Sequence, residues 1–364
     1  MEIQRLQATH LRCVDEVDLA PGPRLNFLVG PNGAGKTTIL EAIYLLSHGR
    51  SFRGGALDVL AQRGQVGFSV HAEVASKAYG RCALGMAREA EGWRLRVNGF
   101  DQPTLVSVLE RCAVGCFEPG SQDLIAGGAE ERRRFLDWGV FHVEHCSLES
   151  WRNWKRALRQ RNALLRSGGS PEQFRIWEAE LARFANPIES ARRTYFQALV
   201  PYLEGFFDRL LPELGPPRLH YQPGWNVEQP LFQVLQEQRQ HDCYQGRTRS
   251  GPHRADWRVG FEGAPTRDYL SRGQTKLVAL ACILAQASLY AAQKGEWPIL
   301  CFDDPASELD PNHQELLFEE ISSYPLQAWI TATGKKCLPS HPTATLFHVE
   351  QRQVMRLAPP GAMI

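Results

Sequence analysis

The chain has 364 residues, of which 43% are hydrophobic and 22% are charged, and its formal net charge is +1. This composition is typical of a globular protein and excludes a disordered or fibrous chain. Because the net charge is close to zero, no strong overall field attracts nucleic acid or acidic lipid, and any basic surface has to be local.

The first 128 residues predict a mixed α/β region. The opening residues, MEIQRLQATHLR, lack the charged and then apolar pattern of a signal peptide. Further on, short strands are broken by Gly and Pro, and apolar residues alternate with polar ones in VGFSVHAEV (66–74) and WRLRVNG (93–99). The turn-like pair Gly127-Gly128 closes this part of the chain.

Within this region, GPNGAGKTT lies between the apolar LNFLV and the helix-compatible ILEAIYLL. The pattern G-x-x-x-x-G-K-[ST] allows backbone amides to curl around phosphates at the start of a helix. Lys36 would reach the β- and γ-phosphates, and Thr37 would give a hydroxyl to Mg²⁺. A fortuitous glycine turn is the alternative, but strand, loop and helix stand here in the required order. The predicted nucleotide-binding residues are Gly30, Pro31, Asn32, Gly33, Ala34, Gly35, Lys36, Thr37 and Thr38.

Residues 129–214 predict long helices rich in Arg and Glu, with breaks between helices at SGGSP (167–171) and at Asn186-Pro187. One of these helices carries cations at helical spacing, opposite an apolar side that includes Trp154. Such a row can follow phosphates without reading sequence, although it is more often only a solvated face. The predicted DNA-contacting residues are Arg152, Lys155, Arg156 and Arg159, with Arg166 further along. A second cluster, Arg132 to Arg134, stands beside acidic residues that could neutralise it locally.

Strand and turn signals return in residues 215–364. The helical segment therefore separates two parts of the sequence that both have a mixed α/β pattern. Within this last part, LSRGQTKLVA (270–279) places Ser271 and Gly273 where a long apolar helix would begin. A helix start with a capping serine and a bare glycine backbone can bind an anion, and a plain N-cap is the alternative. We predict an α/β head formed by residues 1–128 and 215–364, with an inserted helical arm domain at 129–214.

The segment ILCFDDPASELD predicts a buried strand, Ile299 to Phe302, that delivers Asp303 and Asp304 to its carboxyl end. Asp303 can hold Mg²⁺, and Asp304 can orient an attacking water molecule. Alone, such a pair would be an acidic turn, but together with GPNGAGKTT it predicts phosphoryl chemistry. We predict catalytic roles for Lys36, Asp303 and Asp304, and metal binding by Thr37 and Asp303.

The cysteines and the apolar segments bear on the cellular compartment. The nine cysteines are odd in number and show no CxxC spacing, which favours reduced thiols and argues against a zinc site. The most apolar run, Leu277 to Ala292, is shorter than the roughly 20 residues of a membrane helix. We interpret it as a buried core helix and expect a cytoplasmic protein without a membrane partner.

Taken in order, GPNGAGKTT, LSRGQ and FDDPASELD resemble the Walker A, signature and Walker B plus D-loop motifs of ABC-type ATPases. The resemblance implies an ABC-type P-loop head that binds ATP and Mg²⁺. It also implies that the signature contacts the γ-phosphate held by a second subunit, so that ATP binding joins two chains into a homodimer. The residues concerned are Ser271, Arg272, Gly273 and Gln274 in the signature and Asp310 in the D-loop.

The chain departs from the usual ABC pattern in several places. Arg272 replaces the first glycine of LSGGQ, and Asp304 replaces the usual glutamate, which makes slow hydrolysis plausible. The late strand AWITATGKK (328–336) offers Thr331 and Thr333 but no switch histidine, and Gln122 is a candidate for the Q-loop glutamine.

A longer series of segments resembles the RecF family of DNA replication and repair proteins. The segments are RLQATHLRCVDEVDL, LEAIYLLSHGRSFR, RRRFLDWGVFH, RALRQRNALLR, SGPHRADW, LSRGQTKLVALACILAQ and DDPASELD. The resemblance implies an ATP-driven dimer that binds single-stranded and duplex DNA at their boundaries. It also implies that RecO and RecR are partners and that together they load RecA in recombinational repair and SOS induction. Arg50 and Arg53 would face nucleotide or DNA, or would be solvated residues after a helix end, whereas His253 and Arg254 receive no role.

Three other classes of protein share part of the pattern. The ATPase subunit of an ABC membrane transporter usually places Walker A and signature much closer together and keeps the switch histidine. An SMC-like tether needs long heptad arms, whereas the helical segment here has only some eighty residues. A P-loop kinase would have no use for LSRGQ.

Overall fold

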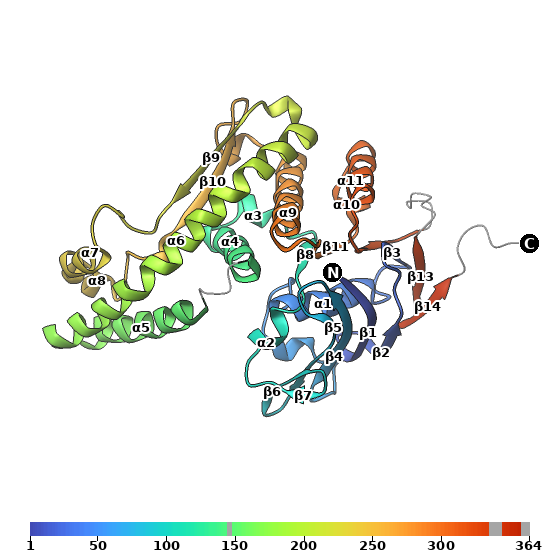
Figure 1. Cartoon of the computed structure of the whole chain (residues 1–364), viewed down its shortest axis with the longest axis horizontal. Coiled ribbons are helices and arrows are strands. Elements are labelled where there is room, and N and C mark those ends of the chain that lie inside the picture. The colour runs from blue at the N-terminus through green and yellow to red at the C-terminus, as the bar shows by residue number, and fades with distance from the viewer. Residues whose placement is uncertain (144–147, 335–343, 358–364) are drawn as a thin grey trace, which may run out of the picture. The chain divides into compact units, whose positions relative to one another are not determined.

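A computed structural model of the chain describes residues 1–143, 148–334 and 344–357 (Figure 1). Two compact units divide the chain: Met1–Gln122 with Arg272–Ile364 forms the first unit, and Asp123–Ser271 forms the second. Cys146, Cys337 and the last two residues of AWITATGKK lie outside the described residues. The seven cysteines within the described residues are all free thiols.

The first unit contains a six-stranded sheet in the order β14-β13-β3-β12-β11-β8, in which only β14 runs antiparallel to its neighbour. Every residue of β3, β11 and β12 is buried, which explains why these strands read as unbroken apolar runs. The predicted strands LNFLV and ILCF are therefore confirmed. The strand bounds are β3 Leu25–Val29, β8 Val114–Phe117, β11 Ile299–Phe302, β12 Ala328–Ala332, β13 Thr345–Glu350 and β14 Gln353–Leu357.

A second sheet of the first unit is entirely antiparallel, with the order β2-β1-β4-β5-β6-β7. Residues of β4 alternate between buried and more exposed positions, as expected for a sheet with one face on a core. The strands predicted within 66–74 and 93–99 are confirmed as β4 and β6. The bounds are β1 Glu2–Leu11, β2 Val14–Leu19, β4 Phe68–Ser76, β5 Gly80–Glu89, β6 Gly92–Val97 and β7 Phe100–Asp101.

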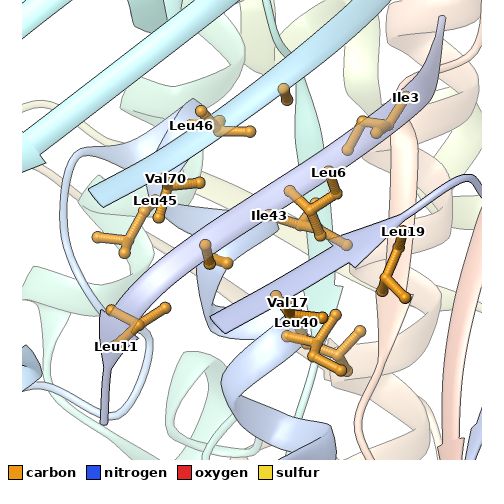
Figure 2. Packing of buried hydrophobic residues seen from close by; sticks show 14 of the residues in the cluster. Ile3, Leu6, Leu11, Val17, Leu19, Leu40, Ile43, Leu45, Leu46 and Val70 are labelled. Carbon is orange, nitrogen blue, oxygen red and sulfur yellow. The ribbon is translucent and has the colours of Figure 1, made fainter. Parts of the chain in front are cut away.

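Helix α1, Lys36–His48, packs against β1 of the antiparallel sheet and against β8 and β12 of the other sheet. Eleven of its thirteen residues are buried, as expected for a helix that lies inside a layered core. Figure 2 shows Leu40 and Ile43 of this helix among Leu6, Val17 and other side chains of the surrounding strands. The phosphate loop therefore leads directly into the central helix of the unit.

The long helix α9, Arg272–Lys294, is the one described helix that is apolar and long enough to cross a membrane by composition alone. In this structure 72% of its most apolar stretch is buried inside the protein, so α9 is a core helix, as the sequence predicted. The remaining helices of the first unit are η1 Leu57–Leu60, α2 Val106–Leu109, α10 Pro305–Glu308 and α11 Pro311–Ser323.

The second unit combines long helices with the two-stranded antiparallel sheet β9-β10. The predicted arm ended at residue 214, but residues 215–271 belong to the same compact unit. Strand β9 and helix α7 pack against α6, and a buried ion pair joins Arg161 of α5 to Asp242 of α8. The bounds are α3 Asp123–Ala126, α4 Ala129–Val143, α5 Leu148–Ser167, α6 Pro171–Leu210, η3 Pro212–Leu214, β9 Pro217–Gln222, α7 Leu231–Glu237, α8 Arg239–Gln245, η4 Pro252–Arg254, β10 Asp256–Phe261 and η5 Arg267–Tyr269.

Helix α6 runs for 40 residues through both Pro187 and Pro201. The predicted break at Asn186-Pro187 is therefore wrong. A proline inside a helix removes one backbone hydrogen bond and costs about 3 kcal/mol. Ala185 and Ile188 beside it are fully buried, and this packing offsets the cost locally. The break at SGGSP is confirmed, because α6 begins there with a capping box between Ser170 and Gln173.

Candidate nucleotide-binding site

The loop between β3 and α1 is shaped for a phosphate group. Gly33 and Gly35 have φ angles of +79° and +113°, which side-chain-bearing residues rarely adopt. A Cβ on Gly30 would come within 1.9 Å of the backbone oxygen of Val349, so the strand leaves no room for a side chain there. Among the residues that the structure describes, no side chain caps the first turn of α1. The first amides of a helix without a side-chain cap have no partner within the helix and can bind an anion, so the residues present fit a nucleotide phosphate.

Lys36 is 7% exposed and folds over this loop. Its Nζ donates to the carbonyl oxygens of Gly30 at 2.6 Å and of Pro31 at 2.9 Å. Burial lowers the pKa of Lys36, and the negative charges of Asp304 and Asp303 oppose that effect. The ammonium group is therefore held at the loop by weak carbonyl acceptors that a phosphate oxygen can replace.

Asp303 lies at the carboxyl end of β11 and meets the phosphate loop directly. Its Oδ1 accepts from the Thr37 hydroxyl at 2.9 Å and from the Thr331 hydroxyl at 2.8 Å. Burial raises the pKa of Asp303, while the two hydroxyls and the charge of Arg53 act to lower it. The predicted metal-binding residues Thr37 and Asp303 are thus adjacent, and a hydroxyl beside a carboxylate is an oxygen donor set that suits Mg²⁺.

Asp304 has φ +48°, the left-handed region that costs a residue with a side chain about 1 kcal/mol or more. Its backbone N–H donates to the Thr331 hydroxyl at 2.7 Å. Thr331 therefore connects both aspartates from β12, the strand between β3 and β11. The sequence drew attention to Thr331 only because no histidine was present. Its bridging role was missed, since it depends on the order of strands in the sheet.

A second group of side chains that sequence reasoning missed surrounds Glu41, which is fully buried in α1. Arg12 donates twice to its carboxylate, from Nε at 3.0 Å and from Nη2 at 2.8 Å, and the Ser51 hydroxyl also donates to it. The backbone N–H of Arg53 in turn donates to Ser51 Oγ at 3.0 Å. This chain of contacts anchors the segment that places the Arg53 charge near Asp303. Arg50 makes no hydrogen bond or ion pair with the other described residues.

The predicted signature residues lie where the chain passes from the second unit back to the first. Ser271 is the last residue of the second unit, and α9 begins directly after it at Arg272. Ser271, Arg272 and Gly273 are exposed, whereas Gln274 is half-buried. An ion pair of 2.8 Å between Lys276 and Glu308 connects the first turns of α9 to α10.

Asp310, predicted for the D-loop, is the N-cap of α11. Its carboxylate accepts from the backbone N–H groups of Asn312 at 3.1 Å and His313 at 3.2 Å. Asp310 thus has a structural role within its own chain.

Gln122, the Q-loop candidate, follows β8 by a short turn and is half-buried.

The predicted DNA-contacting residues Arg152, Lys155, Arg156 and Arg159 are all exposed on α5. The three arginines have no ion pair among the described residues, and Lys155 lies over the ring of Trp151 at 5.6 Å. In contrast, the cluster Arg132 to Arg134 is satisfied locally. Arg132 pairs with buried Asp256, Arg133 donates to a backbone carbonyl, and Arg134 pairs with the neighbouring glutamates.

With this geometry established, comparison with known proteins is decisive. The family model described as RecF/RecN/SMC N terminal domain matches residues 2–355. A protein of Stenotrophomonas maltophilia (strain R551-3) named "DNA replication and repair protein RecF" is 45% identical over 361 residues, which cover 98% of this chain and 99% of that protein. The chain belongs to the RecF family. A RecF protein of Pseudomonas putida (strain GB-1) is 37% identical over 97% of this chain and 98% of its own.

Solved structures agree with this assignment. The structure of "the recombination mediator protein RecF-ATP in RecFOR pathway" matches with a TM-score of 0.88 and 25% identity, over 98% of this chain and 97% of that chain. An Smc head bound to the C-winged helix domain of ScpA matches with a TM-score of 0.60 and 15% identity, over 98% of both chains. The predicted α/β fold with an ABC-type ATPase head and the resemblance to RecF are both confirmed.

Proposed function

We propose that this protein is an ATP-dependent DNA-binding protein of recombinational repair and replication, and a slow ATPase. The observation that carries the proposal is the contact between Thr37, Asp303 and Thr331 beside the uncapped start of α1, with Lys36 held over the loop. Support comes from the RecF family, in which relatives are named for DNA replication and repair and a solved relative is a complex with ATP.

Each residue of the site has a proposed task. The loop amides and Lys36 bind the phosphates of ATP, and Thr37 and Asp303 would hold Mg²⁺. When bound, Mg²⁺ neutralises charge on the phosphates. Asp304 accepts a hydrogen bond from the attacking water and so orients it. Because the side chain of Asp304 is shorter than that of the usual glutamate, we expect slow ATP turnover.

The signature explains why the chain would act as a pair. By the family resemblance, Ser271, Arg272, Gly273 and Gln274 approach the nucleotide held by a second copy, near Asp310, so that ATP joins two chains and hydrolysis releases them. We further propose that the pair acts in the cytoplasm with RecO and RecR at boundaries of single-stranded and duplex DNA. The exposed cations of α5 (Arg152, Lys155, Arg156 and Arg159) would supply salt-sensitive phosphate contacts.

Binding to single-stranded, duplex and gapped DNA, each with and without ATP and over a range of salt concentrations, tests this function. We expect ATP to increase affinity for DNA and Lys36→Ala to remove the increase, because the variant loses the cation at the phosphate loop. Lack of binding by the wild-type protein in all six conditions at low salt would refute a direct role on DNA.

A further inference from the structure

The segment RTRSGPHR, residues 247–254, has no task in the function described so far. We call it the arginine loop. Arg247, Arg249 and Arg254 are exposed, whereas Thr248 and Ser250 between them are buried. The loop lies in the second unit, between α8 and β10.

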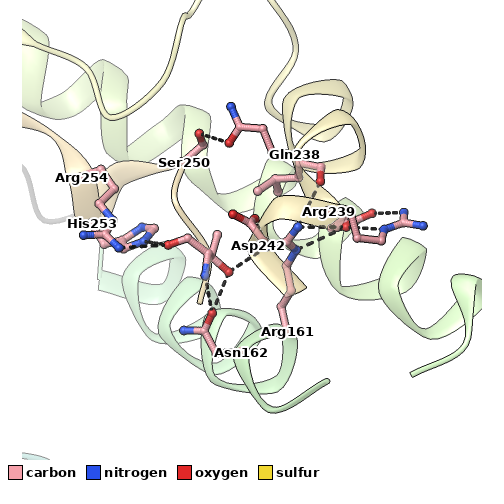
Figure 3. Close-up of polar contacts among 11 residues, drawn as sticks. Arg161, Asn162, Gln238, Arg239, Asp242, Ser250, His253 and Arg254 are labelled. Atoms are coloured by element: carbon pink, nitrogen blue, oxygen red, sulfur yellow. Dashed lines mark hydrogen bonds and ion pairs between the residues drawn. The ribbon is translucent and has the colours of Figure 1, made fainter. Parts of the chain in front are cut away.

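A buried polar network anchors the inner side of the arginine loop, as Figure 3 shows. Asn162 Oδ1 of α5 accepts from the backbone N–H of Thr248 at 2.8 Å and from its hydroxyl at 2.7 Å. Arg161 Nη1 donates to the Thr248 hydroxyl at 2.9 Å. The backbone N–H and the hydroxyl of Thr248 are therefore both hydrogen-bonded to side chains of helix α5.

Hydrogen bonds also hold residues 250–254, the second half of the arginine loop. His253 Nε2 donates to the Thr248 carbonyl oxygen at 2.9 Å, and Arg254 Nη2 donates to the same oxygen at 3.3 Å. The Ser250 hydroxyl donates to Gln238 Oε1 at 2.8 Å. A loop with this many internal bonds presents its exposed side chains from a fixed backbone.

The acidic groups near the arginine loop are already used inside the protein. Fully buried Arg161 pairs with Glu178 at 3.2 Å and with Asp242 at 2.7 Å, and Arg239 also pairs with Glu178. The side chains of Arg247 and Arg249 make no hydrogen bond or ion pair within the described residues. The exposed face of the loop is consequently positive: within the part of the chain that the structure describes, Arg247 and Arg249 have no ion-pair partner, and the charge of buried Asp242 acts on Arg254 from inside the unit.

Arg254 shows that these charges are close enough to affect one another. Burial lowers its pKa, the charges of Arg247 and Arg249 lower it further, and the charge of Asp242 opposes them. Three arginines thus lie close together on the exposed side of an anchored loop, and an anionic ligand would reduce the repulsion among them.

Space for a ligand is present beside the loop. A cavity of about 640 Å³ borders it, lined in part by Arg254, Ser250, Gln238, Trp225 and Asn226. On the other side, a Cβ on Gly246 would lie 3.3 Å from Cγ of Arg166, so the last cation of α5 lies next to the start of the loop. The arginine loop and the cationic row of α5 therefore adjoin each other.

We propose that Arg247, Arg249 and Arg254 bind successive phosphates of a DNA strand and extend the cationic row of α5. The inference rests on the proposed DNA binding and assigns it to particular residues. Guanidinium groups form charge-assisted hydrogen bonds with phosphate oxygens, and a preformed loop avoids the entropic cost of ordering them on binding. An acidic protein segment is the other ligand that this charge could attract, and the experiment separates the two.

The test is the salt dependence of binding to a single-stranded oligonucleotide by full-length Arg247→Gln/Arg249→Gln. This variant removes two charges but none of the bonds that anchor the loop. Because each phosphate contact on a single strand contributes about 0.7 to the slope of log K against log salt, we expect the slope to fall by about 1.4. A matched control, Arg175→Gln/Arg183→Gln, removes two exposed charges from α6 of the same unit and should leave the slope unchanged.

The possible outcomes are distinct. Wild-type affinity and slope in the loop variant would overturn the inference, and so would an equal loss in the α6 control. Loss of binding to an oligoglutamate peptide, with DNA binding intact, would overturn it in favour of a protein ligand. Restoration of the slope by Arg247→Lys/Arg249→Lys would support it, since only charge is then retained. If the wild-type protein itself does not bind DNA, the proposed function fails instead.

Discussion

Thr331 illustrates how one side chain can couple two parts of the candidate site. Its hydroxyl donates to Asp303 and accepts from the backbone N–H of Asp304, whose positive φ needs such support. The glycines of the phosphate loop, Lys36 and the paired aspartates could be predicted from short patterns, since these residue types are needed at fixed spacing. Thr331 could not, because its neighbours in space are about 27 residues away in sequence.

We predict that Thr331→Val lowers the rate of ATP hydrolysis by about 5- to 150-fold, because loss of two hydrogen bonds of about 0.5 to 1.5 kcal/mol each loosens both aspartates. Single-turnover hydrolysis measures the rate. Thr331→Ser keeps the hydroxyl and should remain close to the wild type. Equal rates for the valine and serine variants would show that the bridge has no catalytic importance.

At the scale of elements, the sequence was most informative where a segment is buried on all sides. The strands LNFLV and ILCF and the core helix from Arg272 were recognisable from apolar runs and their flanking residues. It was least informative for α6, where tertiary packing carries a helix through Pro187. Local propensity cannot anticipate this, because the compensating contacts come from distant elements.

The arginine loop gives an element-scale prediction about pH. Burial lowers the pKa of His253 from 6.5 to about 4, because the ring is enclosed and charging it is costly. The unfolded chain therefore takes up the proton more readily than the folded one. The histidine contributes stability above pH 6.5 that is lost as the pH falls towards 4, by about 3 kcal/mol at most.

Hydrogen exchange of the loop amides at several pH values, corrected for the intrinsic exchange rate, measures this effect. Protection of the amides of residues 248–254 other than Pro252 should decrease between pH 6.5 and pH 4 in the wild type. In His253→Gln the decrease should be smaller, because glutamine can still donate to the Thr248 carbonyl but does not titrate. An identical decrease in both proteins would exclude His253 as the cause.

At the scale of the whole molecule, the structure divides the chain into units at other residues than the pattern of predicted helices and strands did. Residues 215–271 read as part of the head because they contain strands, but within the described ranges β9 and β10 pair only with each other, and α6 packs on β9. Strand content alone cannot tell which sheet a strand joins. The signature therefore stands where one compact unit ends and the other begins.

This position matters for the central proposal, in which each chain binds ATP at its own phosphate loop and offers Ser271 to a second copy. The mass of the protein in solution, measured by light scattering with and without ATP, tests it most directly. We predict that ATP raises the mass towards that of two chains, and that Ser271→Arg abolishes the rise while nucleotide binding stays intact. An unchanged mass in the wild-type protein with saturating ATP would contradict the account.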